Sequence, residues 1–455
     1  MKTNRRDFLK IASASAVLPS LGILPSVLHA ATPTITDQYF VFAYFSGGWD
    51  GLLALDPRDP EIFSPSAVSS TGIQPAYDRL RGLEDSDYLI PSSVDGMTFG
   101  PFIGDLADPL IGHADKLTVI RGMAMEAVAH QVARRHALTG IRPAGTAVRA
   151  SSVATLLAYL LGGSEPIPNL VAGLSSFNIG HPLWASGLPA SSIDDLYKAL
   201  SPSATDLMEN QRDALETFFA KQAEQATTQR EQDIYANRNI ARALIESDLA
   251  GYFNVDSGDD EMLALRDRFG VESGATGDGG YLALMAAQAL TKGISRCVTI
   301  KVADGLDSHQ SGAWEGDHGP SLREGFDSIS ALATHLEETP FGEEPGDNWL
   351  NHTTIMCFSE FGRGAKLNTN GGRDHNLINA MMMLGGRTKG GQVVGATTDL
   401  GMMASPIDLA TGAVDPMGEL IGNNHIARTL LHSIGIEEDI GDFRANPIAA
   451  LLEDA

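Results

Sequence analysis

Met356-Cys-Phe-Ser-Glu-Phe-Gly-Arg363, with Gly371-Gly-Arg-Asp-His-Asn376 shortly after it, is the most informative stretch of this chain. An apolar run of strand length ends at Glu360, and a glycine-rich loop then presents the adjacent pair Asp374 and His375. Ligands of α/β proteins bind where strands end, because the sheet holds the backbone while loops present side chains. An Asp-His pair suits zinc, manganese or iron. Taken alone, the pair also fits a loop with a helix-capping Asp and a solvated His.

Similar clusters follow two other apolar runs, which favours a shared site. The run 38–45 is followed by Ser46-Gly-Gly-Trp-Asp50, and the run 297–302 by Asp304-Gly-Leu-Asp-Ser-His309. Because a parallel sheet brings the carboxyl ends of its strands to one edge, we expect Asp50, Asp307 and His309 to converge with the first segment. Ordinary turn chemistry is the alternative for each cluster taken singly.

The order of elements predicts an α/β fold. Apolar runs of strand length alternate with helical patterns over the chain, which indicates a mostly parallel sheet sandwiched by helices. We expect a single domain over residues 32–455, with a charged helical insertion at about 191–275. Strands are expected at 38–45, 116–121, 297–302, 353–358, 379–384 and 390–394, and helices at 151–161, 281–292, 321–338 and 423–436.

The N-terminus predicts export. Asn4-Arg-Arg-Asp-Phe-Leu-Lys10 is a twin-arginine signature, followed by the uncharged run 11–28 and small residues near 29–31. We expect residues 1–31 to be a signal peptide, the twin-arginine translocase to be a partner during export, and the protein to be periplasmic or secreted. The run contains Pro19 and Pro25, so a stable membrane anchor is not expected.

Charge and cysteine content exclude some classes of function. A formal charge of −25 over 455 residues argues against nucleic-acid binding, which needs a basic surface. The chain has two cysteines, Cys297 and Cys357, each within an apolar run. Two cysteines cannot complete a zinc site alone, so we expect two buried free thiols.

Four motifs carry a resemblance to a known family. Phe45-Ser-Gly-Gly-Trp-Asp-Gly-Leu52, Asp307-Ser-His309, Ser359-Glu-Phe-Gly-Arg363 and Gly372-Arg-Asp-His-Asn376 occur in that order. They resemble the Gly-Gly-x-Asp-Gly, Asp-Thr-His, Thr-Glu-Phe-Gly-Arg and Gly-x-Asp-His motifs of the secreted bacterial "domain of unknown function 1501" family. This family is usually placed in the alkaline phosphatase and sulfatase superfamily. The resemblance implies an alkaline phosphatase-like fold and two divalent metal ions, with zinc, manganese and calcium as candidates.

The resemblance also implies a set of metal ligands. Asp50 and the pair Asp374-His375 would hold one ion, and Asp307 and His309 the other, with Glu360 as a further acidic ligand. The closing segment His425-Ile-Ala-Arg-Thr-Leu-Leu431 is similar to a late segment of the superfamily, which adds His425. A solvated residue at a helix N-terminus is the alternative for His425.

The chain departs from the superfamily pattern at the position of the nucleophile. Superfamily enzymes place Ser, Thr or Cys at the start of the helix after an early strand. In sulfatases this helix opens with Cys-x-Pro-x-Arg and ends in Thr-Gly. Aligning that Thr-Gly with Thr139-Gly140 places His130 at the nucleophile position and Arg134 at the position of the sulfatase arginine. Ala129 stands where relatives often have Ser. Either a metal-bound water attacks, or His130 is a ligand, base or covalent acceptor, or the site is not catalytic. We expect a ligand or general-base role for His130, and expect Arg134 or Arg363 to hold an anionic substrate oxygen.

The sequence therefore predicts an exported, metal-dependent hydrolase of phosphate or sulfate esters, with a small-molecule or polysaccharide ester as substrate. The alternative, motivated by Ala129, is a catalytically inactive alkaline phosphatase-like binding or scaffold protein in the cell envelope. A phosphomutase-like transferase is a third possibility, although it needs a hydroxyl nucleophile that the sequence does not reveal.

Overall fold

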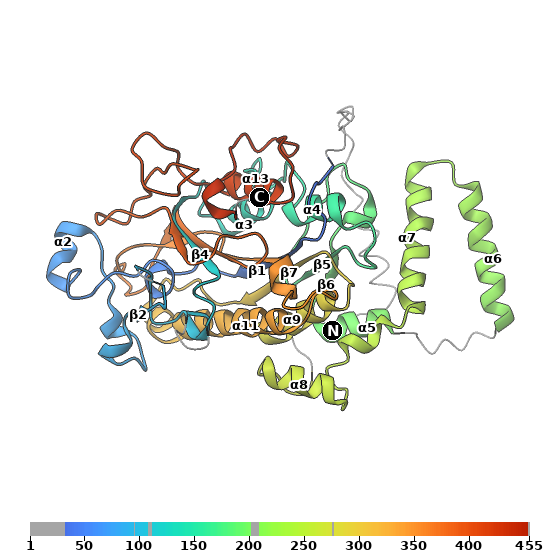
Figure 1. The fold of residues 1–455 in the computed structure, drawn as a ribbon, viewed down its shortest axis with the longest axis horizontal. Helices are drawn as coiled ribbons and strands as arrows, with labels where there is room; N and C mark the ends of the chain where they lie inside the picture. The colour runs from blue at the N-terminus through green and yellow to red at the C-terminus, as the bar shows by residue number, and fades with distance from the viewer. Residues whose placement is uncertain (1–31, 95, 108–111, 202–208, 275–276, 454–455) are drawn as a thin grey trace.

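A single eight-stranded sheet forms the centre of the protein (Figure 1). The computed structural model describes residues 32–94, 96–107, 112–201, 209–274 and 277–453, so the predicted signal peptide at 1–31 lies outside the described residues. The strand order is β12-β4-β11-β8-β1-β7-β5-β6. The strands are β1 (Tyr39–Phe45), β4 (Leu117–Ala124), β5 (Asn169–Ala172), β6 (Leu188–Ala190), β7 (Cys297–Ala303), β8 (Thr353–Phe358), β11 (Ile378–Leu384) and β12 (Gln392–Val394).

β1 lies at the centre because its sequence is apolar on both faces. It pairs in parallel with β7 on one side and β8 on the other. Val41, Ala43 and Phe45 belong to the core on one face of the sheet, and the alternating residues Phe40, Phe42 and Tyr44 belong to the core on the other. A strand without polar alternation is typical of a sheet covered on both sides.

Helices cover both faces, which confirms the predicted α/β class. α9 (Gly279–Thr291) and α11 (Gly319–Glu338) pack against β7 on one face. The other face is covered by α3 (His130–Thr139), α4 (Val153–Leu161) and α13 (Asn423–His432), and Figure 1 shows the two layers on either side of the strands. Cys297 and Cys357 are free and buried, as predicted.

The remaining elements are short or lie outside these layers. The helices are α2 (Val68–Thr71), α5 (Ile193–Leu200), α6 (Glu209–Gln225), α7 (Gln229–Glu246), α8 (Asp260–Arg268), α10 (Ser311–Ala313) and α12 (Trp349–His352), and a wide turn η8 (Trp314–His318) joins α10 to α11. Two small ribbons pair β2 (Ile90–Pro91) with β3 (Thr98–Phe99) and β9 (Gly362–Arg363) with β10 (His375–Asn376). Short 3₁₀ turns are η1 (Gly51–Leu53), η2 (Pro65–Ala67), η3 (Tyr77–Arg79), η4 (Asp85–Asp87), η5 (Gly104–Ala107), η6 (Leu183–Ala185), η7 (Leu249–Phe253) and η9 (Ala449–Leu451).

The carboxyl ends of the parallel strands meet at one edge of the sheet. β8, β1 and β7 are neighbours, so the segments after Phe358, Phe45 and Ala303 emerge side by side. β11 runs antiparallel to both β8 and β4, so β4 points the same way as β8 and leads into α3 at this edge. The loops that the sequence assigned to a shared site therefore start from a common rim.

The predicted insertion contains a helical hairpin. α6 and α7 pack against each other and stand away from the sheet, at the opposite end of the view from α2 (Figure 1). α7 is anchored through contacts with α5, η6 and η7. Of the residues described, none belongs to a helix with the length and apolar content needed to cross a bilayer.

Candidate metal centre

Glu360 follows β8 directly and is fully buried. Both carboxylate oxygens accept the backbone N–H of Gly47 at 3.2 Å, and Oε1 accepts Nδ1–H of His130 at 2.8 Å. Burial raises the pKa of Glu360, but hydrogen bonds from His130, Tyr44 and backbone amides outweigh it and hold the pKa below its usual range. Glu360 is therefore a buried anion whose partner is an imidazole.

Two glycines let the loop after β1 approach the loops after β7 and β8. Gly47 has a φ of +117°, and a Cβ there would lie 2.6 Å from the backbone nitrogen of Asp307. A Cβ on Gly48 would lie 2.3 Å from the ring of Phe361. Only glycine fits such close contacts at these positive φ values, so this turn sets the spacing of the three loops.

His130 is the first residue of α3, after Ala129, whose side chain makes no capping hydrogen bond. Its Nδ1 faces Glu360, and its Nε2 is 3.4 Å from Oδ2 of Asp307. The hydrogen bond with Glu360 raises the pKa of His130 against burial, which lowers it. An imidazole oriented by a carboxylate thus occupies the start of α3, the position that the resemblance assigned to the nucleophile.

Three atoms that could ligate a metal ion lie close together beside His130. Oδ1 of Asp307 is 3.1 Å from Nε2 of His309 and 3.1 Å from Nε2 of His375, and the two Nε2 atoms are 3.0 Å apart. His130, Asp307 and His375 also offer ligand atoms that all lie within 4.8 Å of one another. The side chains come from α3, the loop after β7 and β10, so tertiary structure alone brings them together.

The outer nitrogens of His309 and His375 are held by oxygen acceptors. Nδ1 of His309 donates to Oδ1 of Asp374 at 2.9 Å, and Nδ1 of His375 donates to the carbonyl of Val128 at 2.7 Å. A carbonyl only accepts, so the His375 proton is assigned to Nδ1, and a neutral ring then presents a lone pair at Nε2. The same holds for His309. Two lone pairs 3.0 Å apart beside a carboxylate can share a bound cation, and Nη1 of Arg363 lies 3.5 Å from Nε2 of His309.

We call His130, Asp307, His309, Glu360, Asp374 and His375 the acid–histidine cluster. It is open to solvent, since the side chain of Asp374 is 67% exposed and that of His309 is 40% exposed. The hydrogen bonds from His309 and Asn368 lower the pKa of Asp374, so this carboxylate stays ionised as it orients the ring. The cluster brings together six of the residues that the sequence singled out.

Arg363 lies beneath the cluster, and its side chain is not exposed. It donates to Oδ1 of Asp307 at 2.6 Å, to the carbonyl of Gly48 at 2.9 Å, to the carbonyl of Arg373 at 3.0 Å and to the carbonyl of Gly47. Burial raises the pKa of Asp307, but the hydrogen bond from Arg363 and the charge of its guanidinium hold it well below its usual range. The guanidinium is committed to the protein, so this geometry gives no support to the predicted substrate contact.

Asp50 is not part of the cluster. Its buried carboxylate lies 2.7 Å from Nε of the fully buried Arg373 and accepts Nε1–H of Trp314 at 2.8 Å. Its backbone N–H donates to Nε2 of His318 at 3.0 Å, and burial lowers the pKa of His318 to about 4. The metal role predicted for Asp50 finds no support, because Arg373 and Trp314 contact its Oδ2 and the backbone N–H of Leu52 donates to its Oδ1.

His425 and Arg134 have other neighbours. His425, near the start of α13, lies 3.3 Å from a carboxylate oxygen of Glu419 and accepts the backbone N–H of Gly422. It makes no contact with the cluster among the described side chains, so its predicted ligand role also finds no support. Arg134 lies one turn after His130 on α3 and donates through Nε to the hydroxyl of Tyr44 at 3.0 Å.

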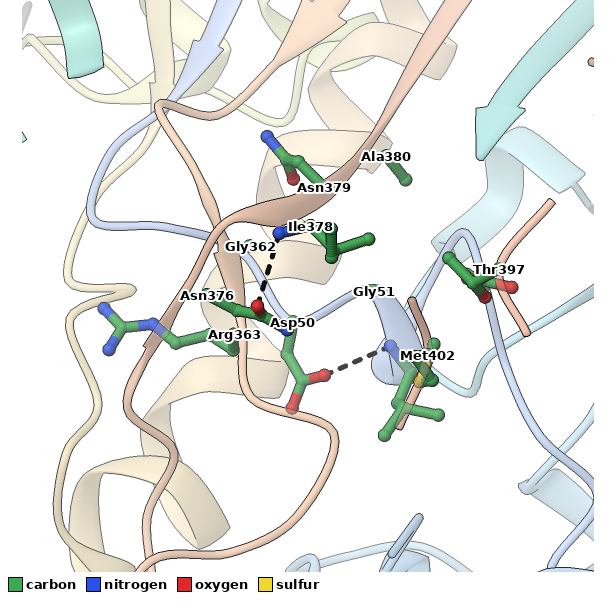
Figure 2. Close-up of a pocket in the computed structure, with 12 residues that line it drawn as sticks. Asp50, Gly51, Gly362, Arg363, Asn376, Ile378, Asn379, Ala380, Thr397 and Met402 are labelled. Carbon is green, nitrogen blue, oxygen red and sulfur yellow. Dashed lines mark hydrogen bonds between the residues drawn. The ribbon is translucent and has the colours of Figure 1, made fainter. Parts of the chain in front are cut away.

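A small cavity lies next to Asp50 and Arg363 (Figure 2). Its volume of about 20 Å³ is room for one water molecule. Oδ1 of Asp50 accepts the backbone N–H of Leu52 at 3.1 Å. The cavity is too small for an ester substrate, whereas the acid–histidine cluster lies on the open surface.

Several residues around the cluster escaped the sequence analysis. Asn368 donates to Oδ1 of Asp374 and to the carbonyl of His309, and Arg373 holds the loop through the carbonyls of Gln74 and Pro75. Arg373 lies inside the Gly-Arg-Asp-His motif, and its place in that motif was the signal that could have identified it. No sequence signal could have identified Val128, because its contact is made by a backbone carbonyl, which every residue has.

The donor set fits a divalent metal ion. Bonds of about 2.0–2.2 Å to nitrogen and oxygen ligands place two ligand atoms roughly 3.0–3.5 Å apart. The separations between Asp307, His309 and His375 are 3.0–3.1 Å. Histidine ligands of metals also donate their second N–H to a carboxylate or carbonyl, as His309 and His375 do here.

Comparisons with known proteins identify a family and several solved structures to which this chain is similar. A family model described as "Protein of unknown function (DUF1501)" matches residues 93–419. The comparison with curated proteins gave no match. Similar solved structures include a protein in the alkaline phosphatase superfamily from Vibrio parahaemolyticus, with 9% identity, a TM-score of 0.34 and coverage of 98% of this chain and 78% of that chain. They also include Ps i-CgsB, alone and in complex with k-i-k-neocarrahexaose, each with 10% identity, a TM-score of 0.38 and coverage of 90% of this chain and 74% or 75% of that chain.

Proposed function

For this chain, which belongs to the DUF1501 family of proteins of unknown function, we propose an exported, metal-dependent hydrolase that acts on phosphate or sulfate esters. The observation that carries the proposal is the contact between Nε2 of His309 and Nε2 of His375, 3.0 Å apart beside Asp307. Both rings donate through Nδ1 to oxygen acceptors, so their lone pairs converge on one point. Asp307, His309 and His375 are the proposed ligands, and a second ion is proposed from the resemblance alone.

A divalent ion bound there would place positive charge next to the oxygens of a phosphate or sulfate ester and would lower the pKa of a nearby water molecule. Asp374 and the carbonyl of Val128 orient the two histidine rings through their Nδ1–H groups. Arg363 fixes Oδ1 of Asp307 from below. These contacts pre-organise the ligands before substrate arrives.

His130 is the proposed general base. Its Nδ1–H is held on Oε1 of Glu360, so Nε2 faces Asp307 and the open side of the cluster and can take up a proton there. An ionised carboxylate stabilises the imidazolium that results, as in other carboxylate–histidine pairs. No hydroxyl or thiol stands at the start of α3, which favours attack by water over a covalent intermediate.

Arg134 is the proposed contact for the anionic group of the ester. It lies four residues after His130, so the two side chains share one face of α3. Only its Nε has a described partner, the hydroxyl of Tyr44. The two terminal nitrogens leave a bidentate donor pair for phosphate or sulfate oxygens.

Hydrolysis of aryl phosphate and aryl sulfate esters by the wild-type chain and four variants tests this proposal. Asp307→Asn is expected to lose both bound metal and activity. His130→Gln is expected to keep the metal and lose at least about 100-fold in kcat. Arg134→Gln is expected to raise KM, and Asp304→Asn, on an exposed carboxylate that pairs with Lys301, is the matched control.

Three results would overturn parts of the proposal. Activity that survives Asp307→Asn would exclude this metal centre. Loss of metal in His130→Gln would make His130 a ligand and leave the base unassigned. Bound metal with no turnover of any ester would favour the alternative, a binding or scaffold protein, for which the absence of a nucleophile at Ala129 is the supporting observation.

A further inference from the structure

The hairpin formed by α6 and α7 has no support from the sheet along most of its length. α6 packs against α7, and α7 reaches the rest of the protein through α5, η6 and η7. Figure 1 shows both helices standing apart from the sheet at one end of the molecule. With 17 and 18 residues, each helix is about 26 Å long. Away from these contacts of α7, the hairpin buries only the surfaces between its own two helices.

The contact between α6 and α7 is polar. Both terminal nitrogens of Arg238 donate to the two oxygens of Glu216, at 3.1 and 2.6 Å, and Arg242 donates to Glu216 at 2.6 Å. The guanidinium of Arg238 also lies over the ring of Phe219, 4.0 Å from its centroid. These ion pairs fix how the two helices are paired, but they remove little apolar surface from water.

Large apolar side chains remain exposed on the same two helices. Leu215 and Phe218 on α6, and Ile234 and Ile240 on α7, are between 41% and 54% exposed. Their burial would contribute roughly 25 cal/mol per Å² of apolar surface. Exposed apolar residues are ordinary when scattered singly, but four on one two-helix hairpin indicate a surface that is covered in solution.

The charge of the hairpin permits a second copy of this chain to approach. Residues 209–246 contain five basic and seven acidic residues, a net charge of −2, so the rest of the chain carries −23 of the total of −25. Two acidic bodies repel each other, and an anionic lipid surface repels them too. The hairpin is the nearly neutral part, and it extends away from the acidic body.

We propose that the α6–α7 hairpin is a dimerisation element, in which the hairpins of two copies pack face to face into a four-helix bundle. An interface about 26 Å long and two helices wide buries on the order of 1,000 Å² in total or more, the size that a specific interface needs. A two-fold axis would bring the same apolar side chains of both copies together. The bundle would place the two acidic bodies at opposite ends, which lowers their repulsion.

The mass of the mature full-length chain in solution tests this proposal. Light scattering after size exclusion is expected to give twice the chain mass at micromolar concentration. The double variant Phe218→Ser with Ile240→Ser is expected to give a single chain mass, with unchanged circular dichroism because both side chains are exposed. Met417→Ser, at a side chain 90% exposed elsewhere on the protein, is the matched control and is expected to stay dimeric.

Disulfide trapping locates the interface independently. The native thiols Cys297 and Cys357 are buried, and burial raises the pKa of both, so neither competes. Phe218→Cys is expected to form a covalent dimer on oxidation, and Met417→Cys is not. A monomeric wild-type chain at about 100 µM, or a dimer that survives the double serine variant, would overturn the proposal. Binding of the monomer to neutral lipid vesicles through the hairpin would overturn it in favour of a membrane contact.

Discussion

Asp307 contacts three imidazoles and one guanidinium, and it uses both of its carboxylate oxygens to do so. Its Oδ1 meets Arg363, His309 and His375, and its Oδ2 faces His130. Asp374 and Glu360, which the sequence also proposed as ligands, each accept a hydrogen from a histidine Nδ1 instead. At the scale of single residues, the sequence therefore named side chains that lie together, but it could not separate proposed ligands from the groups that would orient them. That distinction depends on which ring nitrogen faces inward.

Removal of an orienting carboxylate is expected to weaken metal binding without abolishing it. Asp374→Ala frees Nδ1 of His309, so the ring loses its fixed orientation and part of its basicity. The affinity for zinc or manganese should fall by roughly 10- to 100-fold, as calorimetric titration would measure. Asp304→Ala, on the loop after β7 that also carries His309, serves as the control and should bind as tightly as wild type. Equal affinities for Asp374→Ala and wild type would exclude the orienting role.

The strands of the sheet were the elements most accurately predicted. Continuous apolar runs gave β1, β7 and β8 nearly to the residue, because a strand covered on both faces has no polar positions. The short strands β5 and β6 were missed, since four or three residues carry too little periodicity. The antiparallel direction of β11 was also missed, because direction is set by the connection through β9 and β10 and not by composition.

The position of Asp50 outside the acid–histidine cluster has an element-scale cause. The turn after β1 ends at the correct edge of the sheet, but Arg373 approaches from the loop after β9 and pairs with the carboxylate. Sequence spacing places a residue at a sheet edge, whereas it does not say which charge from another loop reaches that residue first. The pair joins the β1 turn to the loop that carries Asp374.

Loss of this ion pair is expected to destabilise the protein. Arg373→Met leaves the buried carboxylate of Asp50 without its partner, which costs about 3–5 kcal/mol in the free energy of unfolding. Urea denaturation would measure the change. Arg444→Met removes an arginine from an exposed ion pair with Asp442 and should leave stability close to that of wild type, because solvent screens this pair. A similar small change for Arg373→Met would show that the buried pair contributes no more than a surface pair.

At the scale of the whole molecule, stability is expected to fall in acid partly through His335 on α11. Burial, followed by the nearby charge of Arg268, lowers the pKa of His335 to about 4. The unfolded chain has the ordinary value of about 6.5, so it takes up more protons than the folded chain between pH 6.5 and pH 4. The free energy of unfolding should therefore decrease as the pH falls through this window, by up to roughly 3 kcal/mol from this group.

His335→Gln is expected to flatten the pH dependence of stability over that window. Thermal unfolding at pH 7.5 and pH 5.0, with His352→Gln as a control, would measure the difference between the two midpoints. His352 lies between the carboxylates of Asp37 and Asp347, so its replacement should not reduce the sensitivity to acid. A wild-type chain that is equally stable at both pH values would contradict the buried neutral histidine.

The fold and the convergence of the acid–histidine cluster thus follow from strand ends on one edge of a mostly parallel sheet. The central claim is that Asp307, His309 and His375 hold a divalent cation. Elemental analysis of the purified wild-type chain, folded with zinc, manganese or calcium and then dialysed, tests it most directly. The wild-type chain is expected to retain at least about one metal ion per chain. Asp307→Asn is expected to lose this ion, and Asp304→Asn is expected to keep it. Fewer than about half an ion per chain, or equal metal content in both variants, would contradict it.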